Sequence, residues 1–105
     1  MKQYLAKIKE VYNQPVALAD LHLELATHYA TESDRLADLI DSITDRKRIL
    51  KLEAKSISAL QLDYELSEEG KEEKRIKIRL DGVEKLLASI RRRLETFDHQ
   101  VKNEY

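Results

Sequence analysis

The feature that most constrains this chain is a stretch from Val16 to Glu69 that contains neither glycine nor proline. The whole sequence of 105 residues has only two glycines and one proline, so residues that favour tight turns are scarce. A sheet protein needs a turn after each short strand, and this sequence does not supply such turns. Ala, Glu, Lys, Leu and Arg make up more than half of the chain, which is typical of long helices and coiled coils. The sequence therefore predicts an all-α fold.

A seven-residue repeat runs through the stretch. One series recurs at every seventh position and comprises His22, Tyr29, Leu36, Ile43, Leu50, Ile57 and Tyr64. A second series lies three residues after such positions and comprises Leu18, Leu25, Leu39 and Leu60, with interruptions at Glu32, Arg46 and Glu53. After Gly70, apolar residues alternate in steps of four and three through Ile76, Leu80, Val83, Leu87, Ile90, Leu94, Phe97 and Val101. Both patterns predict helices that pack along one seam, as in coiled coils.

The N-terminal segment predicts a separate short helix. Tyr4, Leu5, Ile8 and Val11 fall at helical spacing, and Pro15 is suited to the first turn of the helix that follows. We therefore expect one helical domain over residues 1–105, with helices at about 2–13, 15–68 and 71–103. The predicted architecture is a short N-terminal helix followed by a long, coiled-coil-like antiparallel helical hairpin, which assembles into a helical bundle.

The position of the hairpin turn is open between two registers seven residues apart. A turn at Gly70 makes the numbers of facing residues add up to 140 and pairs Tyr64 with Ile76, which gives the larger number of apolar layers. A turn at Ser67 gives a sum of 133 and a good helix start, because Ser67 precedes two glutamates. In a third arrangement one helix continues through Gly70 in a parallel dimer. We prefer the turn at Gly70.

Apolar residues outside the seam predict self-association, because a two-helix hairpin leaves both edges of its seam uncovered. These residues are Ile40, Ile49, Leu52, Leu62, Leu66, Ile78 and Leu86. The short first helix covers only part of the region from Val16 to Leu25. The candidate assembly surface consists of Tyr4, Leu5, Ile8, Ile40, Ile49, Leu62 and Leu86, and the expected partners are further copies of the chain and another protein.

Two basic clusters form the candidate surface for an anion or an acidic partner: Arg46, Lys47, Arg48 and Lys51, and then Arg91, Arg92 and Arg93. A turn at Gly70 brings the clusters together as one basic zone. A turn at Ser67 instead places Arg92 opposite Asp41 and Arg35 opposite Asp98, so that the cations are paired within the fold. No aromatic residues are interleaved with the clusters to stack on bases, which weakens a nucleic-acid interpretation.

Residues for catalysis or metal binding do not converge in the sequence. The chain has no cysteine, its serines lack a glycine-rich elbow, and its three histidines form no Glu-x-x-His pair of the di-iron type. We therefore expect no enzyme, no cofactor and no metal. The N-terminus lacks the apolar run of a secretory signal, and no segment is long and apolar enough for a membrane span, so we expect a cytoplasmic protein.

These observations favour a non-catalytic coiled-coil interaction protein, an oligomeric adaptor or assembly factor that binds another protein. The alternative is a nucleic-acid-associated accessory protein that uses the basic zone at residues 46–55 and 91–93 on phosphates.

Overall fold

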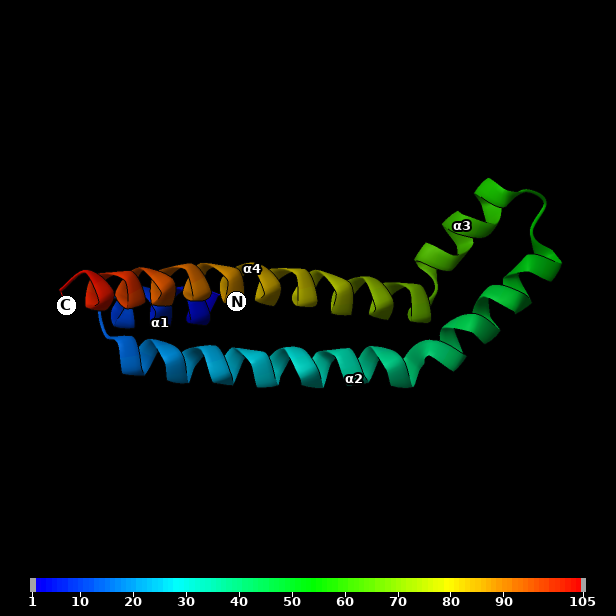
Figure 1. Ribbon diagram of the computed structural model, residues 1–105. Coiled ribbons are helices and arrows are strands. Elements are labelled where there is room, and N and C mark those ends of the chain that lie inside the picture. Colours follow the sequence, from blue (N-terminus) through cyan, green and yellow to red (C-terminus); the bar gives the residue numbers. More distant parts are fainter. Residues whose placement is uncertain (1, 105) are drawn as a thin grey trace. The chain divides into compact units, whose positions relative to one another are not determined.

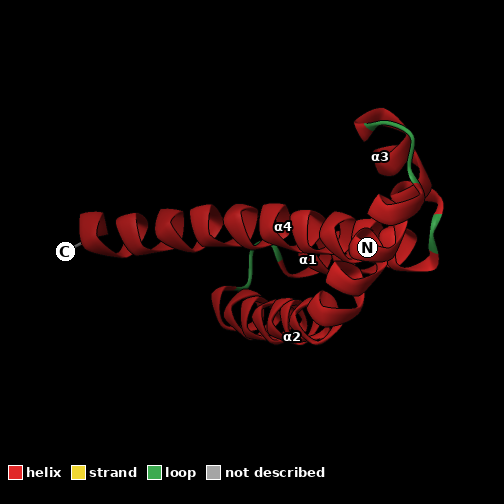
Figure 2. Cartoon of the chain, turned by 90° about the vertical axis from the view of Figure 1, so that its right-hand side faces the viewer, coloured by secondary structure: helices red, strands yellow, loops and turns green. Residues whose placement is uncertain are grey.

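The computed structural model describes residues 2–104, and the side chains of residues 2–101. Over residues 2–104 it contains four α-helices and no strand: α1 (Lys2–Val11), α2 (Pro15–Glu53), α3 (Ile57–Leu66) and α4 (Glu68–Glu104) (Figure 1). Figure 2 shows that the segments between the helices are short loops. The all-α prediction is confirmed, as is the order of a short N-terminal helix followed by an antiparallel helical hairpin.

Helix α1 ends at Val11, and α2 begins at Pro15, as the position of the proline predicts. The N–H of Gln14 donates to the carbonyl of Val11 at 2.9 Å, and Pro15 is the first residue of α2. Proline suits this position because its missing N–H would have no partner within the helix. The carbonyl of Gln14 accepts from the N–H of Leu18 at 2.9 Å, which closes the first turn of α2.

The helix expected over residues 15–68 is divided at residues 54–56. The hydroxyl of Ser56 accepts a hydrogen bond from the N–H of Ala59 at 3.1 Å, so Ser56 is the N-cap of α3. Beyond this break the chain reverses, because Lys47 of α2 lies over the ring of Tyr64 of α3, 4.6 Å from its centroid. The hairpin turn is therefore formed by Ala54, Lys55 and Ser56.

Neither predicted register is formed. Arg35 pairs with Glu72 and Arg46 pairs with Glu69, so the numbers of facing residues add up to 107 and 115, not to 140 or 133. The pair of Lys47 and Tyr64 gives 111. These sums agree with a turn at residues 54–56 and not with one at Gly70 or Ser67. Both turn predictions were wrong because the returning arm of the hairpin consists of α3 and α4 together.

Ser67 connects α3 to α4, so the last helix begins at Glu68, where the less favoured register placed a helix start, and not at about residue 71. Its N–H donates to the carbonyl of Tyr64 at 3.0 Å, and its hydroxyl accepts from the N–H of Gly70 at 3.1 Å. Gly70 lies in the first turn of α4 and does not have a positive φ, contrary to the expected turn role. A Cβ at residue 70 would lie 1.9 Å from the carbonyl oxygen of Tyr64. Glycine is therefore required here by the close approach of the two backbones.

The described chain divides into two compact units. The terminal unit runs up to Thr31 and resumes at Arg79, and the turn unit comprises Glu32–Ile78. In the terminal unit, α1 and parts of α2 and α4 enclose a core of Ile8, Leu18, Leu21, Leu25, Val83 and Ile90. The prediction that the first helix covers part of the region from Val16 to Leu25 is thereby confirmed.

The turn unit has a smaller apolar interior. Its buried apolar residues are Ile43, Tyr64 and Ile76, and the carboxylate-bearing Glu32 is also buried. Ile76, Val83 and Ile90 all belong to the predicted seam after Gly70, and each is fully buried in its unit. The seam prediction is correct for these residues because helical periodicity is a local property that does not depend on the position of the turn. The expectation of a single domain stays a prediction.

Candidate functional site

The first basic cluster lies in the turn unit, and three of its four residues have partners there. Arg46 forms a two-pronged pair with Glu69, with Nε 3.0 Å and Nη2 3.4 Å from the two carboxylate oxygens. Arg48 pairs with Asp45 at 3.0 Å along the same helix. Lys47 lies over the ring of Tyr64, and Lys51 is exposed. Arg46 and Lys47 therefore hold α2 against the returning arm of the hairpin, whereas the pair of Arg48 lies within α2.

Acids at the start of α4 are the partners that sequence reasoning missed. Glu69 accepts a hydrogen bond from Arg46. Glu72 pairs with Arg35 at 2.8 Å and with Arg75 at 3.1 Å. The phenol of Tyr64 donates to Glu73 at 2.9 Å. The spacing of these glutamates on one helix was a visible signal, since residues three and four apart share a face. Their partners could not be assigned while the register was unknown.

This network shifts two pKa values. Burial of the Tyr64 ring raises the pKa of its phenol, and the hydrogen bond to Glu73 and the negative charges of Glu73 and Glu69 raise it further. The pKa of Glu69 is lowered, first by a hydrogen bond from its own backbone N–H and then by Arg46. At neutral pH the site therefore contains a protonated phenol and a carboxylate stabilised in its charged form.

The second basic cluster lies in the terminal unit, where Arg93 is a structural residue. Its Nε donates to the carbonyl of Tyr12 at 3.0 Å, and its Nη2 donates to Oδ1 of Asn13 at 2.7 Å. The guanidinium also lies 4.4 Å from the ring centroids of Tyr12 and Phe97. Arg93 thus fixes the connection between α1 and α2 onto α4. Sequence reasoning missed this role, although Phe97 stands one helical turn after Arg93.

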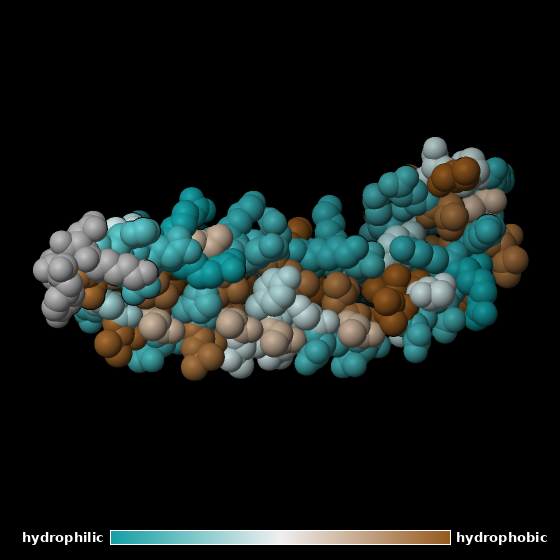
Figure 3. Space-filling model, viewed as in Figure 1, coloured by the Kyte–Doolittle hydropathy of each residue, from teal (hydrophilic) through white to brown (hydrophobic). Residues whose placement is uncertain are grey.

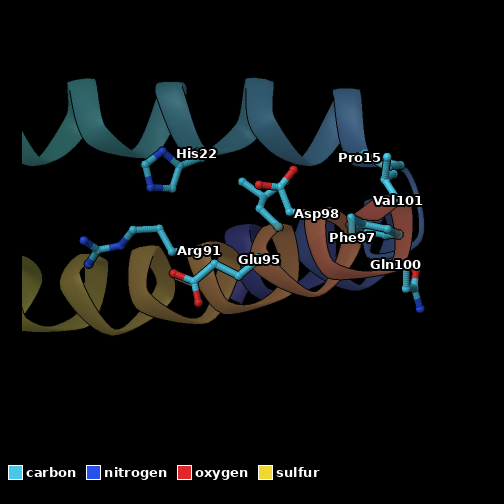
Figure 4. Close-up of a pocket in the computed structure, with 9 residues that line it drawn as sticks. Pro15, His22, Arg91, Glu95, Phe97, Asp98, Gln100 and Val101 are labelled. Atoms are coloured by element: carbon cyan, nitrogen blue, oxygen red, sulfur yellow. The ribbon is translucent and has the colours of Figure 1, made fainter. Parts of the chain in front are cut away.

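Arg91 and Arg92 are exposed and lie beside grooves of the terminal unit. Arg91 lines a groove of about 520 Å³ between α2 and α4, which Figure 4 shows together with His22, Glu95 and Asp98. Nε2 of His22 is buried and has no hydrogen-bond partner among the described residues. Arg92 lines a smaller groove of about 230 Å³ with Tyr12, Ser89 and Thr96. The larger groove mixes apolar side chains with charges of both signs.

The turn at Gly70, from which a single basic zone would follow, is not formed. The first cluster contacts α3 and the start of α4 within the turn unit, and the second contacts the α1–α2 connection within the terminal unit. The pairing expected from a turn at Ser67 is not formed either, because Arg35 pairs with Glu72 and not with Asp98.

The residues of the predicted assembly surface divide into two groups. Ile8 is buried in the core of the terminal unit, and Tyr4 and Leu86 pack against that core, so these three residues stabilise the fold itself. Leu5, Ile40, Ile49 and Leu62 are exposed. Four further large apolar residues of the turn unit are exposed as well: Leu52, Ile57, Leu66 and Ile78.

Among these, Ile57 was not expected at the surface, because the heptad repeat places it in the seam. It is 85% exposed because it stands at the hairpin turn, where no helix faces it. Figure 3 shows hydrophobic side chains gathered over α3 and the neighbouring end of α2. We call the seven exposed apolar residues of this unit the turn patch: Ile40, Ile49, Leu52, Ile57, Leu62, Leu66 and Ile78.

Comparisons with protein families, with curated proteins and with solved structures found no match. Within the described residues, no group of three or more His, Cys, Asp or Glu side chains is arranged to hold a metal ion. In that same part of the chain, no helix is both long enough and apolar enough to traverse a lipid bilayer.

Proposed function

We propose that the chain is a non-catalytic helical interaction protein, an oligomeric adaptor or assembly factor, which binds another protein through the turn patch. The observation that carries this proposal is the distribution of apolar side chains in the turn unit. Among the described residues, this unit exposes seven large apolar side chains and buries three. Single exposed apolar residues are common, but an excess of this kind on one small unit is typical of a binding surface.

Helix α3 is the best candidate for the centre of the contact. Leu62 and Leu66 lie one turn apart on the same face of α3 and are both exposed. On the opposite side of the helix, Tyr64 is buried against α2. Helix α3 therefore has one apolar face that is packed and a second that is free, which is the arrangement that a partner helix or an apolar groove recognises.

The nucleic-acid alternative is less well supported by the contacts of the cations. Arg46, Arg48 and Arg93 already donate to groups of the chain itself. Arg91 and Arg92 are the exposed arginines of the second cluster. If this alternative were correct, binding to an oligonucleotide would weaken steeply with salt and would be lost in the double variant Arg91→Gln/Arg92→Gln, in which the structural Arg93 is retained.

Affinity purification from the native host with paired variants tests the proposal. Leu62→Gln/Leu66→Gln removes the free apolar face of α3, and Leu5→Gln/Leu23→Gln changes two exposed leucines of the terminal unit. We expect the first variant to lose a partner protein that the original chain and the second variant both retain. Circular dichroism of both variants verifies that the helices are intact. Equal retention by all three proteins would contradict a role for α3.

A further inference from the structure

The hairpin turn contains no residue that requires a turn. Ala54, Lys55 and Ser56 separate α2 from α3, and no described residue has a positive φ. Alanine and lysine are among the best helix formers, and serine is tolerated within helices. Helical hairpins with connections of two to five residues usually rely on glycine or another residue suited to a special backbone conformation. This turn is therefore made from residues that are equally able to continue the helix.

The heptad repeat crosses the turn without a change of phase. Ile43, Leu50, Ile57 and Tyr64 are each seven residues apart, although the chain reverses between the second and the third. Ile43 and Tyr64 are buried and Leu50 is half-buried, but Ile57 is 85% exposed. The repeat thus predicts that Ile57 is a buried residue of one continuous helix, whereas in the closed hairpin its side chain is exposed.

The closed turn is held by few polar contacts. The N–H of Ala54 donates to the carbonyl of Leu50, which ends α2, and the Ser56 hydroxyl accepts from Ala59. In a continuous helix, the N–H groups at the start of α3 and the carbonyls at the end of α2 would bond to each other. Conversion of residues 54–56 to helix therefore satisfies these groups without a cap.

We propose that two copies of the chain exchange their returning arms, α3 and α4, by straightening residues 54–56 into helix. In the exchanged dimer, α2 and α3 of each copy form one helix, and the two long helices cross in antiparallel fashion at the former turn. Arg46 of one copy then pairs with Glu69 of the other, and Arg35 with Glu72. Each contact of the closed hairpin is kept but is made between copies, which is why such exchange is a low-cost route to a dimer.

The exchange also covers a side chain that the closed hairpin leaves exposed. With the observed register, the antiparallel crossing keeps Leu50 opposite Leu60, now between the two copies. Ile57 lies in the neighbouring layer of the same seam and becomes covered. Association has an entropic cost, so we expect the closed monomer at low concentration and the exchanged dimer at high concentration. This inference concerns a second copy of the chain and does not rest on the proposed binding of another protein.

Cross-linking tests the exchange, since the sequence contains no cysteine. One chain carries Arg46→Cys and a second, distinguishable by mass, carries Glu69→Cys. The two are unfolded together, refolded at high concentration and treated with a short bifunctional maleimide. We expect a covalent heterodimer in the dimer fraction from gel filtration. A matched mixture of Arg46→Cys with Glu84→Cys controls for random coupling, because Glu84 lies in the terminal unit.

A second experiment changes the turn itself. Ser56→Ala removes the cap that the closed hairpin uses and favours the continuous helix, so the dimer dissociation constant should fall by about fivefold or more. Ser58→Ala, in the first turn of α3, is the matched control and should leave the constant unchanged. The exchange is refuted if both proteins are strictly monomeric at all concentrations, or if a dimer forms in which Arg46→Cys of one chain links to Glu69→Cys of the other no more often than to Glu84→Cys in the control mixture.

Discussion

The two units of the molecule bury apolar surface to different extents, although the same two long helices contribute to both. In the described part of the chain, the terminal unit buries six large apolar side chains and exposes five, whereas the turn unit buries three and exposes seven. The terminal unit contains α1, whose Ile8 joins the core formed with Leu18 and Leu25 of α2. The comparison shows that a third helix across a two-helix seam converts an open edge into a core.

Polar contacts between helices replace apolar ones in the turn unit. Arg35 and Glu72, Arg46 and Glu69, and Tyr64 and Glu73 all connect α2 or α3 with the start of α4. The arginine side chains of these pairs are 55% and 41% exposed, and ion pairs exposed to this extent contribute little to stability. We therefore expect the turn unit to open more readily than the terminal unit, which suits a segment that binds a partner or exchanges arms.

The largest expected effect tests the core of the terminal unit. Leu25→Ala removes a fully buried side chain and should lower the free energy of unfolding by about 3 kcal/mol. Leu23→Ala, two residues earlier on the same helix, removes a side chain that is 67% exposed and should change it by less than about 0.5 kcal/mol. Denaturant unfolding followed by circular dichroism measures both. Similar losses for the two variants would contradict the buried core.

A smaller effect should be confined to the turn unit. Gly70→Ala places a Cβ against the carbonyl oxygen of Tyr64, and the backbone must shift to accommodate it. We expect a loss of about 1 to 3 kcal/mol, typical of overpacking. Hydrogen exchange should accelerate in α3 and the first turns of α4 and not in α1. Lys71→Ala, an exposed neighbour, is the control, and equal acceleration in both units would show that the two units open together.

The sequence predicted those parts of the fold that depend on local periodicity. The seam residues Val83 and Ile90 are buried as their spacing requires, and the off-seam residues Ile40 and Leu62 are exposed. Leu86 is the exception among the off-seam residues, because it packs against the core that α1 completes. Its burial depends on a third helix, and a repeat that describes two helices contains no information about it.

The position of the turn could not be obtained in this way. The repeat continues through Leu50, Ile57 and Tyr64 without a change of phase, so periodicity does not mark the reversal. Ser56 was the available signal, as a potential N-cap, but it follows two good helix formers. The position of the turn decides which residues face Arg35 and Arg46. The predicted partners of these two arginines were therefore wrong for the same reason. The turn was wrongly placed at Gly70 because glycine is required both by a positive φ and by the close approach of two backbones. The sequence does not show which of the two applies, and at Gly70 it is the close approach.

The smallest predicted effect uses pH to test the polar interior of the turn unit. Tyr64→Phe keeps the buried ring but removes its hydrogen bond to Glu73, and should cost about 1 kcal/mol at neutral pH. Because the phenol has a raised pKa in the folded chain, its contribution to stability is complete below pH 10, the ordinary pKa of tyrosine. The contribution is lost as the pH rises from 10 through the raised value, since the unfolded chain releases the proton first. Thermal unfolding between pH 8 and about 12 should therefore show that the unfolding temperature of the original chain falls more steeply with pH than that of Tyr64→Phe. Tyr12→Phe, which changes an exposed ring of the terminal unit, is the control and should behave like the original chain. Parallel declines in all three proteins would mean that the phenol of Tyr64 is not held by Glu73.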